Sequence, residues 1–173
     1  MKNPNITPTS VEKVMREDDF IVSKTDLKGL ITYGNRIFIE FSGYSEEELL
    51  GSQHNIIRHP DMPRGVFKFL WDTIQGKDEC NAYVKNMAKD GSYYWVFANI
   101  TPEFGRDGQI TGYTSVRRKP RAEAVRLLSG VYRTMLEIEK KAGPKDACSA
   151  SLNYLAGLLA EKQMGYTEFI SSI

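Results

Sequence analysis

Hydrophobic and polar positions alternate along two short runs near the N-terminus, and this alternation predicts a β-hairpin. Residues 20–25 and 30–33 are rich in β-branched and aromatic side chains, and the Asp-Leu-Lys-Gly sequence between them is a turn signal. Ahead of the hairpin, Thr9 or Ser10 is placed to cap a short helix over residues 11–17. The chain is therefore expected to begin with a helical segment followed by two antiparallel strands.

The apolar spacing then changes to the three- and four-residue steps of helices. Asn35 is placed to cap a helix over residues 36–41, and Ser45 followed by three glutamates begins a one-turn helix that ends at Gly51. A longer helix over residues 65–75 follows, marked by the apolar residues Val66, Phe67, Leu70, Trp71 and Ile74. This part of the chain is expected to form a layer of helices.

Three strand-like runs come next, at residues 81–87, 92–101 and 110–117, and an Asp-Gly turn signal separates the first two. Both faces of the middle run are apolar, so we expect it inside a sheet and covered on both sides. The order β-β-α-α-α-β-β-β predicts an α+β fold, with one five-stranded antiparallel sheet and helices on one face.

From Pro120 onward two amphipathic helices are expected, one reaching about Lys141 and one over residues 147–162, with Gly143-Pro144 between them. Their apolar stripes fit three partners: their own domain, a second copy of the chain, or another protein. The chain thus divides into an N-terminal segment with a cap helix (1–18), a core domain (19–119) and a C-terminal helical pair (120–173).

The composition argues against a nucleic-acid-binding or membrane-spanning protein. A net charge of +1 creates no strong positive field that would attract nucleic acid, and no run of apolar residues is long enough to span a membrane. Cys80 and Cys148 lie far apart, as expected for free thiols, and no signal peptide precedes them, so we expect a cytoplasmic protein. Paired carboxylates, G-x-S-x-G and metal-ligand spacing are absent from the sequence, which argues against an enzyme.

One polar stretch stands apart, His54-Asn-Ile-Ile-Arg-His-Pro-Asp-Met-Pro63, which holds both histidines of the chain. Its two prolines lack backbone hydrogen-bond donors and favour an extended backbone conformation in the residues that precede them. We therefore expect a shaped loop rather than a helix or strand. Binding residues tend to lie on loops of this kind.

This loop and the later motifs resemble a PAS domain of the type found in bacterial aerotaxis and energy-taxis receptors. The resemblance spans residues from about 20 to 118, and it depends most on R-H-P-D-M-P at 58–63, V-K-N at 84–86 and Y-W-V at 94–96. It implies a PAS fold with FAD bound non-covalently between the helices and the sheet, and with the redox state of the FAD as the input.

The resemblance also implies roles for single residues. Asn86 is expected at the edge of the flavin ring, where an amide can turn over its hydrogen bond when N5 is protonated. Arg58 and His59 are expected to bind the pyrophosphate or the adenine, with Asp61 orienting one of them or binding a ribose hydroxyl. The remaining expected ligands or wall residues of the pocket are Trp71, Asn35, His54, Asn99 and Tyr94. Of these, Trp71 is equally suited to the hydrophobic core, and Asn99 is better suited to a structural role in the sheet.

Alternatives stay open at this point. Aerotaxis relatives carry a tryptophan before V-K-N, where this chain has Cys80-Asn-Ala-Tyr83, so Tyr83 is the other source of an aromatic wall. A haem with His54 or His59 as its axial ligand is a second reading, and a cofactor-free interaction module is a third. As partners, the resemblance implies a membrane-bound chemoreceptor-like protein, with this chain as a stand-alone PAS subunit, and a homodimer.

Overall fold

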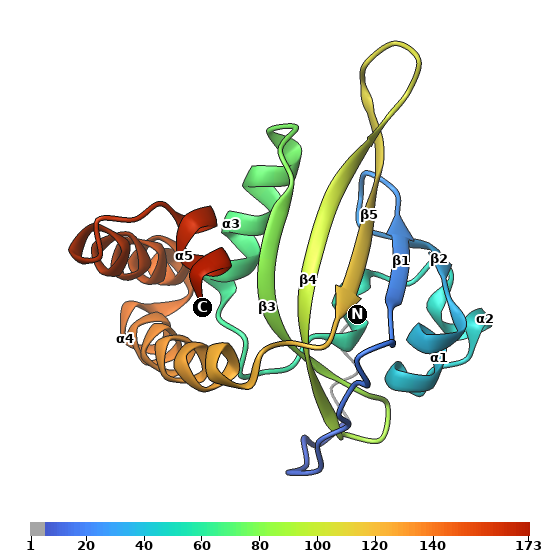
Figure 1. Cartoon of the computed structure of the whole chain (residues 1–173), viewed down its shortest axis with the longest axis horizontal. Coiled ribbons are helices and arrows are strands. Elements are labelled where there is room, and N and C mark those ends of the chain that lie inside the picture. The colour runs from blue at the N-terminus through green and yellow to red at the C-terminus, as the bar shows by residue number, and fades with distance from the viewer. Residues whose placement is uncertain (1–5) are drawn as a thin grey trace.

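The computed structural model describes residues 6–173, and its centre is a five-stranded antiparallel sheet in the order β2-β1-β5-β4-β3 (Figure 1). The strands are β1 (Ile21–Thr25), β2 (Ile31–Gly34), β3 (Cys80–Met87), β4 (Tyr93–Phe104) and β5 (Ile110–Arg118). The first strand pairs with the last, so segments far apart in sequence meet in the middle of the sheet. The predicted sheet and fold class are confirmed, and β4 lies inside the sheet as expected.

The elements between β2 and β3 form the helical layer. They are α1 (Arg36–Ser42), α2 (Glu46–Leu49), the 3-10 turn η1 (His54–Ile57) and α3 (Arg64–Gln75). Asn35 caps α1 by accepting from the amide of Phe38, and a capping box between Ser45 and Glu48 begins α2, as predicted. The predicted shaped loop at 54–63 differs from the structure over its first four residues, which form the 3-10 turn.

The cap helix predicted over residues 11–17 is absent, because this segment is extended and lies beside β4. The amide of Tyr93 donates to the carbonyl of Val11, and the amide of Lys13 donates to the carbonyl of Tyr93. Pairing between β4 and β5 begins only at Phe97, so the edge of β4 before that residue is open. Backbone hydrogen bonds to this open edge stabilise the extended segment more than a short helix would, because an isolated helix of this length is only marginally stable.

The C-terminal region packs against its own domain. Helix α4 (Ala122–Glu161) is interrupted at Gly143, whose φ of 78° breaks it into the two helices that were expected. A further short helix, α5 (Tyr166–Ser172), was not predicted. The hydroxyl of Tyr132 donates to the carbonyl of Tyr83 at 2.8 Å, and the rings of Tyr132 and Trp95 stack. The helices thus cover β3 and the adjoining part of β4 (Figure 1).

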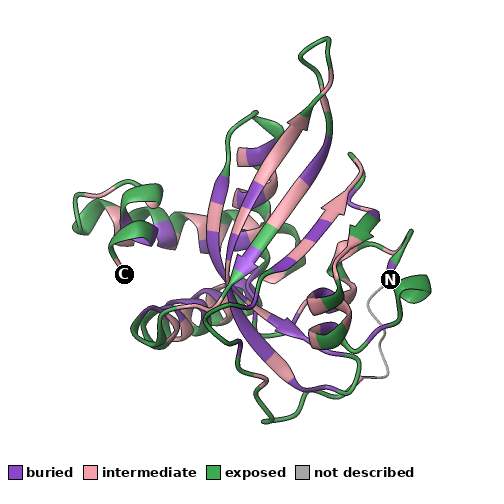
Figure 2. Ribbon diagram, turned by 45° about the vertical axis from the view of Figure 1, so that its right-hand side comes forward, coloured by how far each residue is buried: buried purple, intermediate pink, exposed green. Residues whose placement is uncertain are grey.

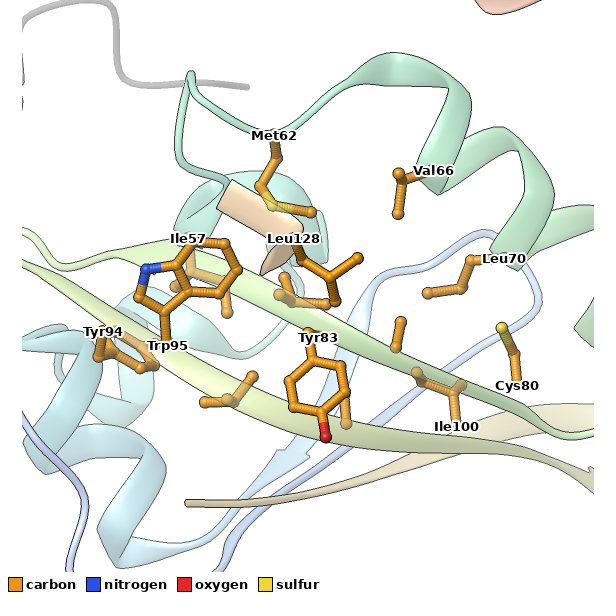
Figure 3. Packing of buried hydrophobic residues seen from close by; sticks show 14 of the residues in the cluster. Ile57, Met62, Val66, Leu70, Cys80, Tyr83, Tyr94, Trp95, Ile100 and Leu128 are labelled. Carbon is orange, nitrogen blue, oxygen red and sulfur yellow. The ribbon is translucent and has the colours of Figure 1, made fainter. Parts of the chain in front are cut away.

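The hydrophobic core follows the predicted periodicity. Val66 and Leu70 are directed from α3 toward the strands, and Leu128 of α4 joins the same cluster (Figure 3). Burial is concentrated in the strands and the inner sides of the helices, whereas the tip of the β4–β5 hairpin is exposed (Figure 2). None of the helices in residues 6–173 is both long enough and apolar enough to cross a bilayer.

Candidate functional site

A cavity of about 360 Å³ lies between α3, the η1 region and the inner face of the sheet. Its volume falls within the range of about 300–1,000 Å³ found for small-molecule sites. Even-numbered residues of β3 and β4 face it, as do odd-numbered residues of β1 and β5, because side chains alternate across a strand. The lining from the sheet comprises Ser23, Thr25, Val84, Asn86, Ala98, Ile100, Tyr113, Ser115 and Arg117.

The walls of this cavity are mainly aromatic and aliphatic. Trp71 of α3 meets the ring of Tyr113 edge-on, with centroids 5.4 Å apart. Gly29, which has φ of 79°, turns the chain tightly beside the indole of Trp71, where an added Cβ would lie 3.2 Å from the ring. Trp71 therefore lines the cavity. Tyr83 does not, because its ring lies on the opposite face of the sheet against Phe97.

Asn86 is the polar group that β3 presents to the cavity. The residue is 4% exposed, and its side-chain amide has no hydrogen-bond partner among the described residues. Its backbone forms a β-bridge with Arg58, which ties the polar loop to the edge of the sheet. A buried amide without a protein partner has its hydrogen-bonding capacity available for a ligand.

Three polar side chains in the cavity wall, those of Arg117, Ser23 and His54, are linked by hydrogen bonds. The guanidinium of Arg117 donates to the Oγ of Ser23, and the Oγ of Ser23 lies 2.9 Å from the Nε2 of His54. The serine oxygen accepts from the arginine, and it shares with Nε2 of His54 a hydrogen bond whose direction is set by the imidazole tautomer. Burial and the charge of Arg117 lower the pKa of His54 to about 3, so the imidazole is neutral near pH 7.

This neutral histidine predicts a loss of stability in acid. The unfolded chain takes up a proton at His54 below pH 6.5 or so, whereas the folded chain does so only near pH 3, so stability falls as the pH drops through that window. Between pH 7 and pH 4 we expect His54 to lower the free energy of unfolding, measured with urea, by about 3 kcal/mol. His54→Gln should flatten the profile; parallel profiles for both proteins would contradict the assignment.

The rim of the cavity is cationic. Arg58 is partly buried and lies over the ring of Phe67, with its Cζ 4.1 Å from the ring centroid, while the side chains of Arg64 and Lys68 reach the rim from α3. Within the described residues no acidic side chain lines the cavity. The arrangement suits a ligand that is flat at its buried end and anionic where it leaves the protein.

Several expected site residues lie elsewhere. Arg58 and His59 are neighbours in an extended segment and so face opposite sides; the buried His59 ring meets Tyr93 edge-on, away from the cavity. Asp61 is exposed on the opposite face of the sheet and pairs with Lys85, with 2.6 Å between Oδ2 and Nζ. The loop therefore contributes Arg58 and His54 to the cavity, but not His59 or Asp61.

The other three residues expected to bind the ligand contact the protein itself, outside the cavity. Asn35 uses its side chain to cap α1 and to bond the backbone of Val22 and Phe20. Asn99 is on the opposite face of the sheet, where its Nδ2 donates to Asn81 and Glu79. Tyr94 is fully buried beside Phe41 and does not line the cavity.

Three functional candidates were missed in the sequence. Arg117 and Ser23 are core-facing polar residues, and the alternation within their strands carried that signal, since a core-facing arginine is rare. Cys148 lines the cavity from the second half of α4, a position that depends on how the helices dock and leaves no trace in the local pattern. Both cysteines are free, as expected, and no group of metal-ligating side chains occurs in residues 6–173.

Comparison with known proteins identifies relatives of this arrangement. The chain is 38% identical over 121 residues to the aerotaxis receptor of Escherichia coli (strain K12), covering 70% of this chain and 24% of the receptor. It is 28% identical over 117 residues to the nitrogen fixation regulatory protein of Klebsiella pneumoniae, covering 68% of this chain and 23% of that protein. The chain thus spans about a quarter of the length of these curated relatives.

Solved structures share the fold. The light-state structure of the blue-light photoreceptor Aureochrome1 LOV superposes with a TM-score of 0.57 at 20% identity, covering 66% of this chain and 90% of the LOV chain. A light-oxygen-voltage domain studied with a flavin analogue gives a TM-score of 0.56 at 20% identity, covering 63% and 82%. The family profile described as the PAS fold matches residues 31–117, half of the chain. The chain therefore belongs to the PAS family.

Proposed function

We propose that this PAS domain binds FAD in the cavity beneath α3 and acts as a redox sensor for a signalling partner. The observation that carries the proposal is the combination of an apolar, aromatic cavity with the unpaired amide of Asn86 inside it and three cations at its rim. Each part matches one part of FAD: the flat ring, the hydrogen-bonding edge of the ring, and the pyrophosphate.

The residues present fit the cofactor. Trp71, Phe67 and the aliphatic residues of α3 would enclose the isoalloxazine ring, and Asn86 would bond its edge. Arg58, with Arg64 and Lys68 beside it, would bind the pyrophosphate where the ligand reaches solvent. When bound, the flavin supplies reversible uptake of electrons, and the protein supplies orientation and electrostatics. Its role in this proposal is binding and signalling rather than catalysis.

The relatives support the class of partner. The match to the aerotaxis receptor covers the PAS region, and the other curated relative is also a regulator. We place this chain in the cytoplasm, as a homodimer that transmits its signal to a membrane-bound chemoreceptor-like protein. The two free thiols suit a reducing compartment.

Signal transmission has a physical route from the cavity to the C-terminal helices. Helix α3 forms one wall of the cavity, and the carboxylate of Glu139 in α4 accepts from the amides of Arg64 and Gly65 at the start of α3. Cys148 of the same helical pair lines the cavity directly. A change in the cavity that moves α3 would therefore also shift α4. We propose that this change begins at Asn86, whose hydrogen bond to the flavin would alter on reduction and shift the sheet.

The geometry gives less support to haem. His59 is outside the cavity, and the Nε2 of His54 is hydrogen-bonded to the hydroxyl of Ser23, so an axial bond through that nitrogen would break the link to Arg117. Flavin needs no such rearrangement, because Asn86 and the rim cations already face the cavity.

An equilibrium titration of apo-protein with FAD, followed by quenching of flavin fluorescence, tests the proposal. Asn86→Ala is expected to raise the Kd about tenfold, since an amide hydrogen bond contributes about 1–1.5 kcal/mol. Asn99→Ala is the matched control, because it removes the same amide from the opposite face of the next strand. Equal affinities for the wild type and both variants would remove Asn86 from the site; no binding by the wild type would refute the proposal.

A further inference from the structure

Arg117 is a buried cation with most of its hydrogen-bonding capacity unused. The residue is 2% exposed, and its guanidinium donates through Nη2 to the hydroxyl of Ser23. Its Nε and Nη1 atoms are buried without any hydrogen-bond partner. Buried guanidinium groups are normally paired with carboxylates or fully hydrogen-bonded, because an uncompensated charge costs several kcal/mol.

The residues around Arg117 do not neutralise its charge. In the described part of the chain no acidic side chain forms an ion pair with it, and His54 is held neutral at the other end of the Ser23 bridge. The guanidinium lies over the ring of Phe38, with Cζ 4.8 Å from the centroid. A cation–π contact of this kind offsets only about 2 kcal/mol when desolvated.

The side chain of Arg117 lies in the wall of the cavity, where its Nε and Nη1 atoms are covered by the protein. Arg117 lines the cavity, and its register partner on β4 is the small Ala98, which leaves space over the strand. Arg58, Arg64 and Lys68 are at the rim, whereas Arg117 is fully enclosed at the far end with Ser23. The two sets of cations thus differ in burial, with Arg117 in the enclosed part of the cavity and the others nearer to solvent.

We propose that Arg117 is the charge partner of the buried end of the ligand, binding the carbonyl and imide edge of the flavin ring more tightly when that edge is negative. This inference rests on the proposed FAD site. Uptake of two electrons from an external reductant and one proton at N5 leaves one negative charge on the ring, at its imide side. A fixed cation at that edge stabilises the reduced ring relative to the oxidised one, which raises the midpoint potential.

The midpoint potential separates this role from a purely structural one. We would titrate the FAD-loaded wild type, Arg117→Met, Arg117→Lys and Arg58→Ala with dithionite against reference dyes. A structural defect weakens both redox states equally and leaves the potential unchanged. Arg117→Met is expected to weaken binding of reduced FAD at least tenfold more than that of oxidised FAD, equivalent to a fall of about 30 mV for a two-electron couple. Arg117→Lys and Arg58→Ala should stay near the wild-type potential.

An unchanged potential in Arg117→Met would overturn the proposal. The apo-protein provides a second measurement that does not depend on FAD. If Arg117 is an uncompensated charge awaiting its partner, apo Arg117→Met should unfold at a higher urea concentration than the apo wild type. A lower midpoint would show that the charge has a structural role and would also overturn the proposal. If the wild type binds no FAD, the assignment to flavin fails, while a stabilised apo variant still identifies Arg117 as a site for a negative ligand.

Discussion

Glu139→Ala is expected to lower the free energy of unfolding by about 3 kcal/mol, the largest effect of a single substitution on stability that we predict. The buried carboxylate accepts from the amide of Gly65 at 2.8 Å, the amide of Arg64 at 3.0 Å and the hydroxyl of Ser151 at 2.7 Å. Its loss leaves three donors without their acceptor and removes a negative charge from the start of α3. Thermal unfolding should shift downward by about 6–12 °C.

The effect should be specific to this buried carboxylate. Glu137 lies two residues earlier on the same helix and is exposed, so Glu137→Ala is a matched control and should change stability by less than about 0.5 kcal/mol. Equal effects of the two variants would mean that Glu139 does not join α4 to α3. Because α3 also forms the cavity wall, the Glu139 variant tests the proposed route of signal transmission at its first contact.

Arg58→Ala is expected to raise the Kd for FAD by about 10–100-fold, the largest effect on binding. A charge-assisted hydrogen bond to phosphate contributes about 1.5–3 kcal/mol. Arg58 is held for this role by Phe67 beneath its guanidinium and by a hydrogen bond from Nη2 to the carbonyl of Met62. Fluorescence titrations with FAD provide the measurement.

Riboflavin separates the two ends of the site, because it has the ring without the pyrophosphate. Its affinity should be nearly the same for the wild type and Arg58→Ala. Arg106, exposed in the β4–β5 turn, supplies a matched control, and Arg106→Ala should bind FAD normally. If riboflavin binding fell as much as FAD binding, Arg58 would contact the ring instead of the pyrophosphate.

The fold could be predicted from the sequence wherever local signals agreed with the tertiary structure. The capping residues Asn35 and Ser45 and the apolar spacing of α3 each identified a helix, since one face of each must be buried. The extended path of residues 11–13 could not be predicted in the same way. It depends on the unpaired edge of β4 at Tyr93, which exists only after the sheet has formed.

Part of the site could also be predicted from the sequence, where a motif or the alternation of side chains along a strand carried the signal. Motif resemblance selected Arg58, Asn86 and Trp71, all of which line the cavity. Strand alternation separates Asn86 from Asn99 and Arg58 from His59, and these distinctions follow from residue parity once the register is known. Cys148 enters the site through docking of α4, which no local pattern encodes.

The central claim is that the cavity beneath α3 holds a flavin, and the absorbance spectrum of the freshly purified protein tests it most directly. We predict yellow protein with the paired near-ultraviolet and blue bands of an oxidised flavin, which dithionite bleaches. FAD should be released on denaturation in a ratio of about one per chain, as expected for one cavity. A Soret band would instead indicate haem. Colourless protein that does not take up added FAD would contradict the account.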